Sequence, residues 1–447
     1  MITLIVSIVF LFVVWANPVW GVGLMLVTLY FPLLPNVQIG PVEFSVTTIP
    51  VLGLAFGALM RSRSHTFRIS LAGWQKVLMV LLGMAFFISS LASSNFNLTV
   101  LMLPNLVVYL LVLFGIMAAV DTPEKLRFLT KVILVLGFIL SLWRVELRPL
   151  RAMFQLPSLM INGASFSFHP AIFLALVILL FSQFQSFSIR WRWFAMLALV
   201  SMLVHGIQYE TRGAWLSWLL VLPIILNRIP LKGWVRFIPV ILFVGLITFS
   251  IYAAVIDFNY NQAEIAIRAG LGQTDYTDVV SKDDRFRLMV RDLGIRMFWE
   301  RPLLGWGANT FIFLQRQFAT SETELLFSGA FNAWLALLVE MGLMGALAGL
   351  AISLAPLAIT WSALRKQKNK NAELAFGFAL GVLAMVIHLL FIDLMFSFYW
   401  AHVALALAAA RLALQNNSIS DENISTSSRF EKGSDDLLRL KNQRSRF

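Results

Sequence analysis

The sequence predicts an all-α polytopic membrane protein of about twelve transmembrane helices, and its composition is the first reason. Of its 447 residues, 59% are hydrophobic and only 13% are charged, and the mean hydropathy is +0.81. A soluble domain carries about 25% charged residues, so this chain has too little polar surface for a soluble globule. A transmembrane helix needs about 20 apolar residues, and twelve of them would occupy a little over half of the chain.

The second reason is that the apolar residues form long runs separated by basic or polar breaks. The runs are Ile2–Ala16, Pro18–Leu34, Thr47–Met60, Trp74–Ala92, Leu98–Val120, Phe128–Trp143, Phe168–Phe187, Trp193–Ile207, Gly213–Leu226, Phe237–Ile256, Ala330–Trp361, Ala375–Leu394 and Met395–Leu414. The run from Ala330 is either one tilted span or a short helix that leads into one. The last two runs are divided near Asp393 because together they are too long for one span. The first run lacks a basic region and a cleavage site, so we interpret it as a retained span.

The third observation is that short basic clusters follow every second span. They lie at residues 61–68, 125–131, 190–192, 228–236 and 365–370. Lys and Arg accumulate in cytoplasmic loops, so these clusters predict the cytoplasmic face, and the intervening connections then face outward. The same rule accounts for the net charge of +12 without a nucleic-acid partner.

This topology divides the chain into four parts. We expect an N-terminal transmembrane bundle over 1–257, a large periplasmic loop over 258–329, C-terminal transmembrane helices over 330–414 and a disordered cytoplasmic tail over 415–447. The tail is rich in Ser, Asn, Lys and Arg, a composition typical of disorder. The sequence shows no internal repeat. It contains no cysteine, which excludes thiolate nucleophiles, Cys-zinc sites, iron–sulfur clusters and disulfides.

Several arginines nevertheless fall in outward connections, at 144–164 and in the large loop. One explanation is that long loops cross the membrane regardless of charge. The other is that outward arginines hold an anionic ligand at the membrane face.

The first informative motif is Thr211-Arg212-Gly213-Ala214-Trp215, at the outward mouth between two spans. It places an arginine at a helix start, followed by small residues that permit close packing. An ionisable residue at membrane depth is a candidate functional residue. The alternative is an interfacial arginine paired with Glu210.

The second motif lies in the large loop, which carries a series of arginines and then Pro302-Leu303-Leu304-Gly305-Trp306-Gly307. Asp283 and Asp284 suit a helix start, and Pro302 suits its end. Arg287 and Arg291 are i, i+4 neighbours on such a helix. Arg301 would return to their face if the helix ran unbroken, whereas Arg285 and Arg296 point away. The alternative is an amphipathic helix lying on the membrane surface.

The third motif is Asn332 followed by Glu340-Met341-Gly342-Leu343-Met344-Gly345, where a helix enters the membrane. Glu340 is a candidate ligand-binding residue, or it pairs locally. Gly342 and Gly345 permit a bend or a close helix contact.

In this order, the three motifs resemble the O-antigen ligase and polymerase superfamily of bacterial envelope enzymes. The signature region covers roughly residues 195–350, and the topology is similar along nearly the whole chain. The resemblance implies a GT-C-type membrane glycosyltransferase with a large helical periplasmic loop, in the bacterial inner membrane. It implies that an oligosaccharide on undecaprenyl pyrophosphate is the donor, that an acceptor hydroxyl attacks the anomeric carbon, and that no metal or other cofactor is needed.

The resemblance also implies the site residues and the partners. Arg212 matches the arginine of the first motif, and Arg287 best matches the loop arginine, with Arg285 as the rival; we expect these to be catalytic. We expect the substrate to be bound by Arg291, Trp215, Trp306, Asn332 and Glu340. Expected partners are the lipid-linked oligosaccharide, a glycan acceptor, the bilayer, a flippase and a chain-length regulator.

The sequence departs from the family at Phe331-Asn332, where ligases usually have a His-Asn pair. Phe331 is neither a base nor a positioning group for the acceptor, so a polymerase is favoured over a ligase. We expect His169 and His205 to be ordinary interfacial residues, and His388 to make a polar contact between helices with Asp393. A transporter of lipid-linked oligosaccharide or of a small anion is the alternative of another class, although transporters often contain repeats.

Overall fold

The fold is described from a computed structural model of the chain. The described residues are 12–13, 17–31, 37–39, 42–44, 53, 57, 71–145, 164–181, 187–208, 212–227, 282–318, 332–366, 370–392 and 397–415. The predicted spans at 237–256 and most of those at 2–16 and 47–60 lie outside these ranges, as does the predicted tail beyond residue 415.

Helices dominate the described part of the chain. They are α2 (Pro18–Tyr30), α4 (Gly73–Leu91), α5 (Phe96–Ala119), α6 (Pro123–Val145), α8 (Ala164–Leu180), α9 (Ile189–Gln208), α10 (Arg212–Leu226), α13 (Lys282–Glu300), α14 (Phe311–Phe318), α15 (Ala333–Lys366), α16 (Lys370–His388) and a C-terminal helix (Ser397–Gln415). Two short antiparallel strands, β1 (Val37–Ile39) and β2 (Val42–Phe44), also occur. The all-α prediction does not include this hairpin, which falls in the connection between two predicted spans.

Local sequence explains how several helices begin. The Asn17 side chain accepts a hydrogen bond from the Val19 amide, and Pro18 occupies the first turn of α2, where a missing N–H costs nothing. The Asn95 side chain accepts from the Leu98 amide at the start of α5. These caps satisfy amides that have no partner within the helix.

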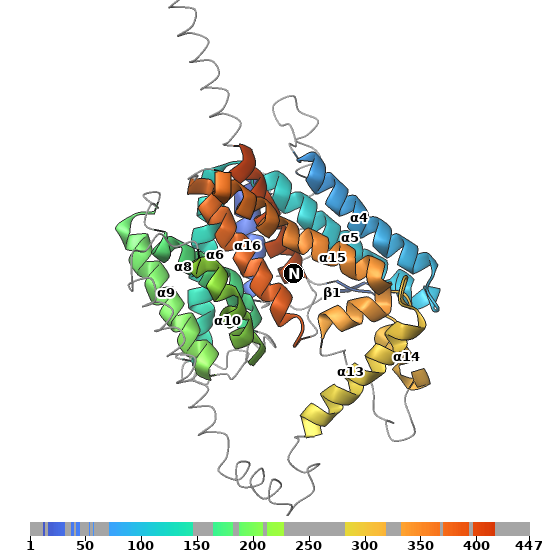
Figure 1. Ribbon diagram of the computed structural model, residues 1–447. Coiled ribbons are helices and arrows are strands. Elements are labelled where there is room, and N and C mark those ends of the chain that lie inside the picture. Colours follow the sequence, from blue (N-terminus) through green and yellow to red (C-terminus); the bar gives the residue numbers. More distant parts are fainter. Residues whose placement is uncertain are drawn as a thin grey trace, which may run out of the picture.

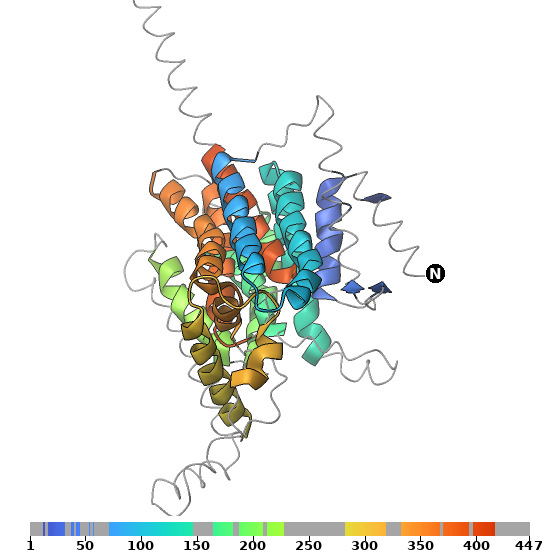
Figure 2. The same cartoon turned by 90° about the vertical axis from the view of Figure 1, so that its right-hand side faces the viewer.

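The helices form a bundle in which α16 is central. It packs against α8, α15 and α10, while α4 packs against both α15 and α5, and α6 and α9 flank α8. Figure 2 shows the bundle helices standing roughly upright, with α13 and α14 at the lower end. Both α16 and the C-terminal helix are 89% buried over their most apolar window, which is why their sequences are apolar on every face.

Small residues allow the central helices to approach closely. Gly377 and Gly381 of α16 are four residues apart, as in the small-xxx-small pattern of membrane helices. A Cβ at Gly381 would lie 2.8 Å from Cα of Pro170 in α8, and a Cβ at Gly377 would lie 3.2 Å from the Val177 side chain. The α8–α16 interface therefore depends on both glycines.

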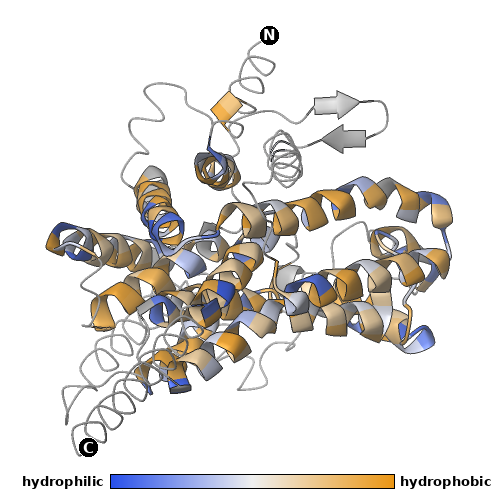
Figure 3. Cartoon of the chain, turned by 90° about the horizontal axis from the view of Figure 1, so that it is seen from above, coloured by the Kyte–Doolittle hydropathy of each residue, from blue (hydrophilic) through white to orange (hydrophobic). Residues whose placement is uncertain are grey.

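Five helices within the described ranges are long and apolar enough to cross a bilayer, and three shorter apolar helices accompany them. Figure 3 shows that hydrophobic residues predominate along most of the helices. These features confirm a multi-pass helical membrane protein. The number of about twelve spans stays a prediction.

Two predicted boundaries gain detail from the structure. The run from Ala330 forms one element, α15, that is broken at Gly342, so a short helix does lead into a longer one. The last two apolar runs are separate helices, with α16 ending at His388 and the next helix beginning at Ser397. Asp393, the predicted point of division, lies outside the described residues.

Candidate functional site

The first motif begins a helix, as predicted, because α10 starts at Arg212. Gly213 leaves no room for a side chain: a Cβ there would lie 2.8 Å from both His388 Cδ2 and Phe391 Cβ, at the end of α16. This glycine therefore lets the first turn of α10 contact α16. The backbone of Arg212 is fixed beside that contact, whereas its side chain lies outside the described part.

Trp215, predicted to bind substrate, is buried between helices. Its Nε1 donates to the Gly206 carbonyl oxygen over 3.2 Å, and its ring packs against Trp218 at 5.9 Å between centroids. The Gly206 carbonyl oxygen belongs to the last turn of α9. Trp215 thus holds the end of α9 against the start of α10, on either side of Arg212.

The third motif begins α15 at the same end of α16. The Asn332 side chain accepts from the Leu335 amide over 3.0 Å, which caps the helix. The Ala333 amide donates to the carbonyl oxygens of Leu389 and Ile392, each over 2.9 Å. The starts of α10 and α15 therefore both contact the end of α16, which brings the backbones of Arg212 and Asn332 into one region.

The second and third motifs meet at the break in α15. Gly342 has φ 65°, a left-handed conformation that glycine adopts without steric cost. On one side of the break, the Trp306 amide donates to the Val339 carbonyl oxygen and the Gly307 amide to that of Glu340, each over 2.9 Å. These carbonyls do not accept from amides further along α15, because the helix is broken just past them, so the loop amides take that place.

The other side of the break is satisfied by the same loop. The Leu343 amide donates to the Pro302 carbonyl oxygen over 2.8 Å, and the Met344 amide to that of Leu303 over 3.3 Å. Irregular backbone at membrane depth is tolerated only where its polar groups have partners. The Pro302–Gly307 segment therefore supplies the hydrogen bonds that a broken α15 lacks.

Glycine is required where these two backbones touch. Gly305 has φ 70°, and a Cβ there would lie 2.5 Å from the Glu340 carbonyl oxygen; a Cβ at Gly342 would overlap the Leu303 carbonyl oxygen. Gly307 has φ 106°, and a Cβ there would overlap the Ser93 side chain. Gly305 and Gly342 thus let the two motifs touch, and Gly307 lets the second motif touch the turn between α4 and α5.

The turn between α4 and α5 closes this junction from a third side. The Ser94 amide and the hydroxyls of Ser93 and Ser94 donate to the Trp306 carbonyl oxygen. The Thr99 hydroxyl donates to the Ala308 carbonyl oxygen over 3.2 Å, and the Ser89 hydroxyl to that of Glu340 over 2.9 Å. No local pattern marks these hydroxyl residues in the sequence, since their partners are distant backbone groups.

Trp306 is buried rather than open to a ligand. Its Nε1 donates to the Met297 carbonyl oxygen over 2.8 Å, and the guanidinium of Arg301 lies 4.3 Å from its ring centroid. Arg301 also donates to the Ala92 carbonyl oxygen at the end of α4. Because α13 ends at Glu300, Arg301 does not continue the face of Arg287 and Arg291.

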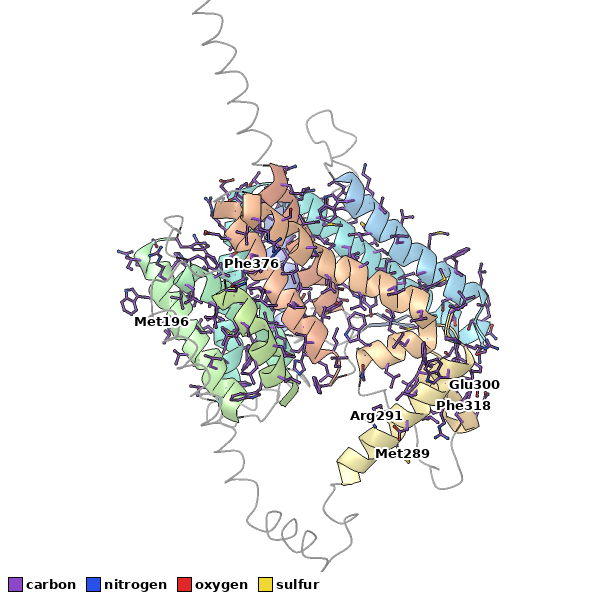
Figure 4. All side chains as sticks on the ribbon, in the orientation of Figure 1. Met196, Met289, Arg291, Glu300, Phe318 and Phe376 are labelled. Atoms are coloured by element: carbon purple, nitrogen blue, oxygen red, sulfur yellow. The ribbon has the colours of Figure 1, made fainter. Side chains whose placement is uncertain are left out.

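The predicted helix of loop arginines exists as α13, and it packs on the first part of α15. A Cβ at Gly294 would lie 2.8 Å from the Leu335 side chain. Arg291 projects from α13 into solvent and contacts the neighbouring Asp292 (Figure 4). Arg285 and Arg287 belong to the first two turns, and their side chains lie outside the described part. Position 287 precedes Gly294 by seven residues, in the same helical row and about 10 Å away along the axis.

Glu340 lies beside a cavity of about 280 Å³. One of its carboxylate oxygens accepts from the Phe311 amide over 3.3 Å, at the start of α14, where a negative charge is favoured. The cavity walls come from α4, α5, α15, the 308–312 turn and Trp400, and are mostly apolar. Of the five predicted site residues whose side chains the structure describes, Glu340 alone lines this cavity.

The structure corrects the interpretation of the histidines. His169 and His205 are fully buried rather than interfacial. His169 lies inside α8 because that helix starts at Ala164, four residues earlier than the apolar run suggests. His388 does contact another helix, and its described partner is His169 over 2.7 Å. No three metal-ligating side chains of His, Asp or Glu gather within the described part of the chain.

The comparisons with known proteins agree with the motifs. Residues 197–350, about a third of the chain, match the family model described as O-antigen ligase. That region runs from α9 to the middle of α15, so it contains all three motifs and the contact between the second and third motifs. A search of curated proteins gives no match. Over residues 197–350 the chain is therefore similar to the O-antigen ligase family.

Proposed function

We propose that the protein polymerises oligosaccharide repeat units carried on undecaprenyl pyrophosphate, at the periplasmic face of the bacterial inner membrane. The observation that supports this proposal is the meeting of the three motifs. The starts of α10 and α15 contact the end of α16, and α13 packs on α15, so the backbones that carry Arg212, Arg287 and Asn332 belong to one end of the bundle.

The residues of this region suit a lipid pyrophosphate leaving group. In the proposed reaction, a hydroxyl of the acceptor glycan attacks the anomeric carbon, and the bond from that carbon to the pyrophosphate oxygen breaks. The hydroxyl proton passes to the departing pyrophosphate or to water. Arg212 and Arg287, with Arg285 as the rival, neutralise the charge that develops on the pyrophosphate. Such electrostatic stabilisation by fixed groups usually contributes most to the rate.

Reconstitution tests this proposal directly. The purified protein, in liposomes with undecaprenyl-pyrophosphate oligosaccharide, should form longer lipid-linked glycans that gel electrophoresis resolves. We expect Arg212→Ala to lower the rate by about a hundredfold or more, and Arg190→Ala to leave it unchanged, because Arg190 is exposed at the start of α9, at the opposite end. If the wild type makes no longer glycan, or if both variants behave alike, the proposal fails.

The family description favours a second candidate function, ligation of the glycan to lipid A-core or another acceptor. Ligation would use the same lipid-linked donor substrate and the same arginines, and only the acceptor would differ. Phe331, in place of the histidine usual in ligases, argues for the polymerase. Lipid A-core added to the same liposomes separates the two, because a ligase moves glycan onto it and a polymerase does not.

A further inference from the structure

Three buried side chains from three helices form a continuous hydrogen-bonded network. Trp218 Nε1 of α10 donates to His169 Nδ1 of α8 over 2.7 Å. His169 Nε2 and His388 Nδ1 of α16 are also 2.7 Å apart. Trp218, His169 and His388 are 1%, 0% and 3% exposed, so water does not replace these contacts.

The indole fixes the direction of every hydrogen bond in this network. An indole N–H only donates, so His169 Nδ1 accepts and carries no proton. The one proton of His169 is therefore on Nε2, which donates to His388 Nδ1. His388 Nδ1 then carries no proton either, and the proton of His388 is on Nε2. The network thus ends in one N–H donor, at His388 Nε2.

This terminal donor faces the start of α10. His388 Nε2 lies 3.1 Å from the position that a Cβ would take at Gly213, and within the described residues it has no hydrogen-bond partner. Gly213 is the second residue of α10, a helix of 15 residues. The first amides of a helix lack partners within it and carry a partial positive charge. Two independent kinds of donor therefore lie close together, next to Arg212 in the chain.

We infer that His388 Nε2–H and the N-terminal amides of α10 form an anion subsite that binds a phosphate group of the pyrophosphate, with His388 as a positioning residue for the donor substrate. This identification of the anion rests on the proposed function. Helix N-termini bind phosphates. Because His388 Nε2–H can only donate a hydrogen bond, it binds the negatively charged leaving group in preference to a neutral ligand. The network keeps His388 in that donor state.

Two substitutions of His388 separate a ligand-binding role from a purely structural one. In His388→Asn, the amide oxygen replaces Nδ1 and keeps the contact with His169, but the terminal donor is lost. In His388→Gln, the amide nitrogen replaces Nε2 and keeps the donor, but the contact with His169 is lost. We expect His388→Asn to weaken binding of farnesyl pyrophosphate by about tenfold or more, and His388→Gln to retain it within about 1.5-fold.

Trp218→Phe provides a third variant that leaves His388 intact. Without the indole, the proton of His169 is free to move to Nδ1, and His388 Nε2 then becomes an acceptor in part of the population. We expect farnesyl pyrophosphate binding to weaken by about threefold. His402→Gln, a buried histidine of the C-terminal helix outside the network, is the matched control and should bind normally.

Binding is measured by thermophoresis of the purified full chain in detergent, with thermal unfolding as the check on folding. Inorganic pyrophosphate should compete, and phosphatidylglycerol should not. The inference is overturned if His388→Asn and His388→Gln weaken binding equally, or if His388→Gln weakens it more. It is also overturned if Trp218→Phe binds normally, or if phosphatidylglycerol competes as well as inorganic pyrophosphate does.

Glycan synthesis is measured in parallel. A wild type that binds pyrophosphate but makes no glycan contradicts only the proposed function, whereas active wild type with normal binding by His388→Asn contradicts only this inference.

Discussion

At the scale of single residues, several motif positions have structural roles that explain their identity. Gly213 admits the ring of His388, Gly305 and Gly342 admit each other's backbones, and the Trp306 indole is bound to a helix carbonyl. These residues shape the site without needing to touch a ligand. We propose that the arginines, whose positions in the chain lie close to these contacts, are the residues that act on the ligand.

Gly342 offers a direct test of the broken helix. We expect Gly342→Ala to lower the thermal stability by roughly 5 °C or more, because a Cβ at φ 65° costs about 1–2 kcal/mol and also overlaps the Leu303 carbonyl oxygen. Thermal unfolding in detergent measures this effect. Gly83→Ala in α4 is the control, since its Cβ would have an ordinary 3.9 Å contact with the Leu110 side chain. Equal stability of the two variants would contradict the role of Gly342.

The loop arginines should differ from one another. We expect Arg287→Ala to lower glycan synthesis by about a hundredfold and Arg291→Ala by about tenfold or less. Neither change should alter stability, since the exposed Arg291–Asp292 pair contributes about 0–1 kcal/mol. Initial rates and thermal unfolding of the same preparations test both statements. A larger loss of rate in Arg285→Ala than in Arg287→Ala would reverse the assignment of the catalytic loop arginine.

At the scale of elements, the contact between α8 and α16 supports the site. α16 carries His388, and α8 carries His169, so their spacing sets the network between them. Gly381→Leu should separate the helices, because even a Cβ at 381 lies 2.8 Å from the Pro170 backbone. We expect a lower yield of monodisperse protein in size-exclusion chromatography, with the loss of farnesyl pyrophosphate binding in what remains. Gly73→Ala, whose Cβ would meet nothing within 4 Å, should behave as wild type.

The starts and ends of secondary-structure elements are also the features that the sequence predicts best. Arg212 at the start of α10 and Pro302 just after the end of α13 follow from local rules, because caps and breakers act on neighbouring residues. The break at Gly342 is only one of two interpretations that the sequence allows, since its hydrogen-bond partners lie about 40 residues earlier in the chain. The His169–His388 pair is not predictable for the same reason. Its members are 219 residues apart, and no local pattern marks them.

At the scale of the whole molecule, the bundle has two chemically different ends. At one end, Arg411 donates to the Met117 and Val120 carbonyl oxygens, and Lys131 lies 5.1 Å from the Trp191 ring centroid. Two of the basic clusters predicted to be cytoplasmic, at residues 125–131 and 190–192, belong to this end within the part of the chain that the structure describes. The motif contacts occur at the opposite ends of α4, α10 and α16. This division agrees with the charge bias that orients membrane helices.

The absence of cysteine makes the orientation testable without any background substitution. Asn97 and Arg190 are both exposed, and each is the second residue of a helix, α5 and α9, at opposite ends of the bundle. If the motifs face the periplasm, a membrane-impermeant maleimide should label Asn97→Cys in intact spheroplasts. It should label Arg190→Cys only after permeabilisation. The reverse pattern would place Arg212 on the cytoplasmic side, where it could not reach a lipid-linked donor substrate that has already crossed the membrane. Labelling of both cysteine variants in intact spheroplasts would contradict a bundle that spans the bilayer.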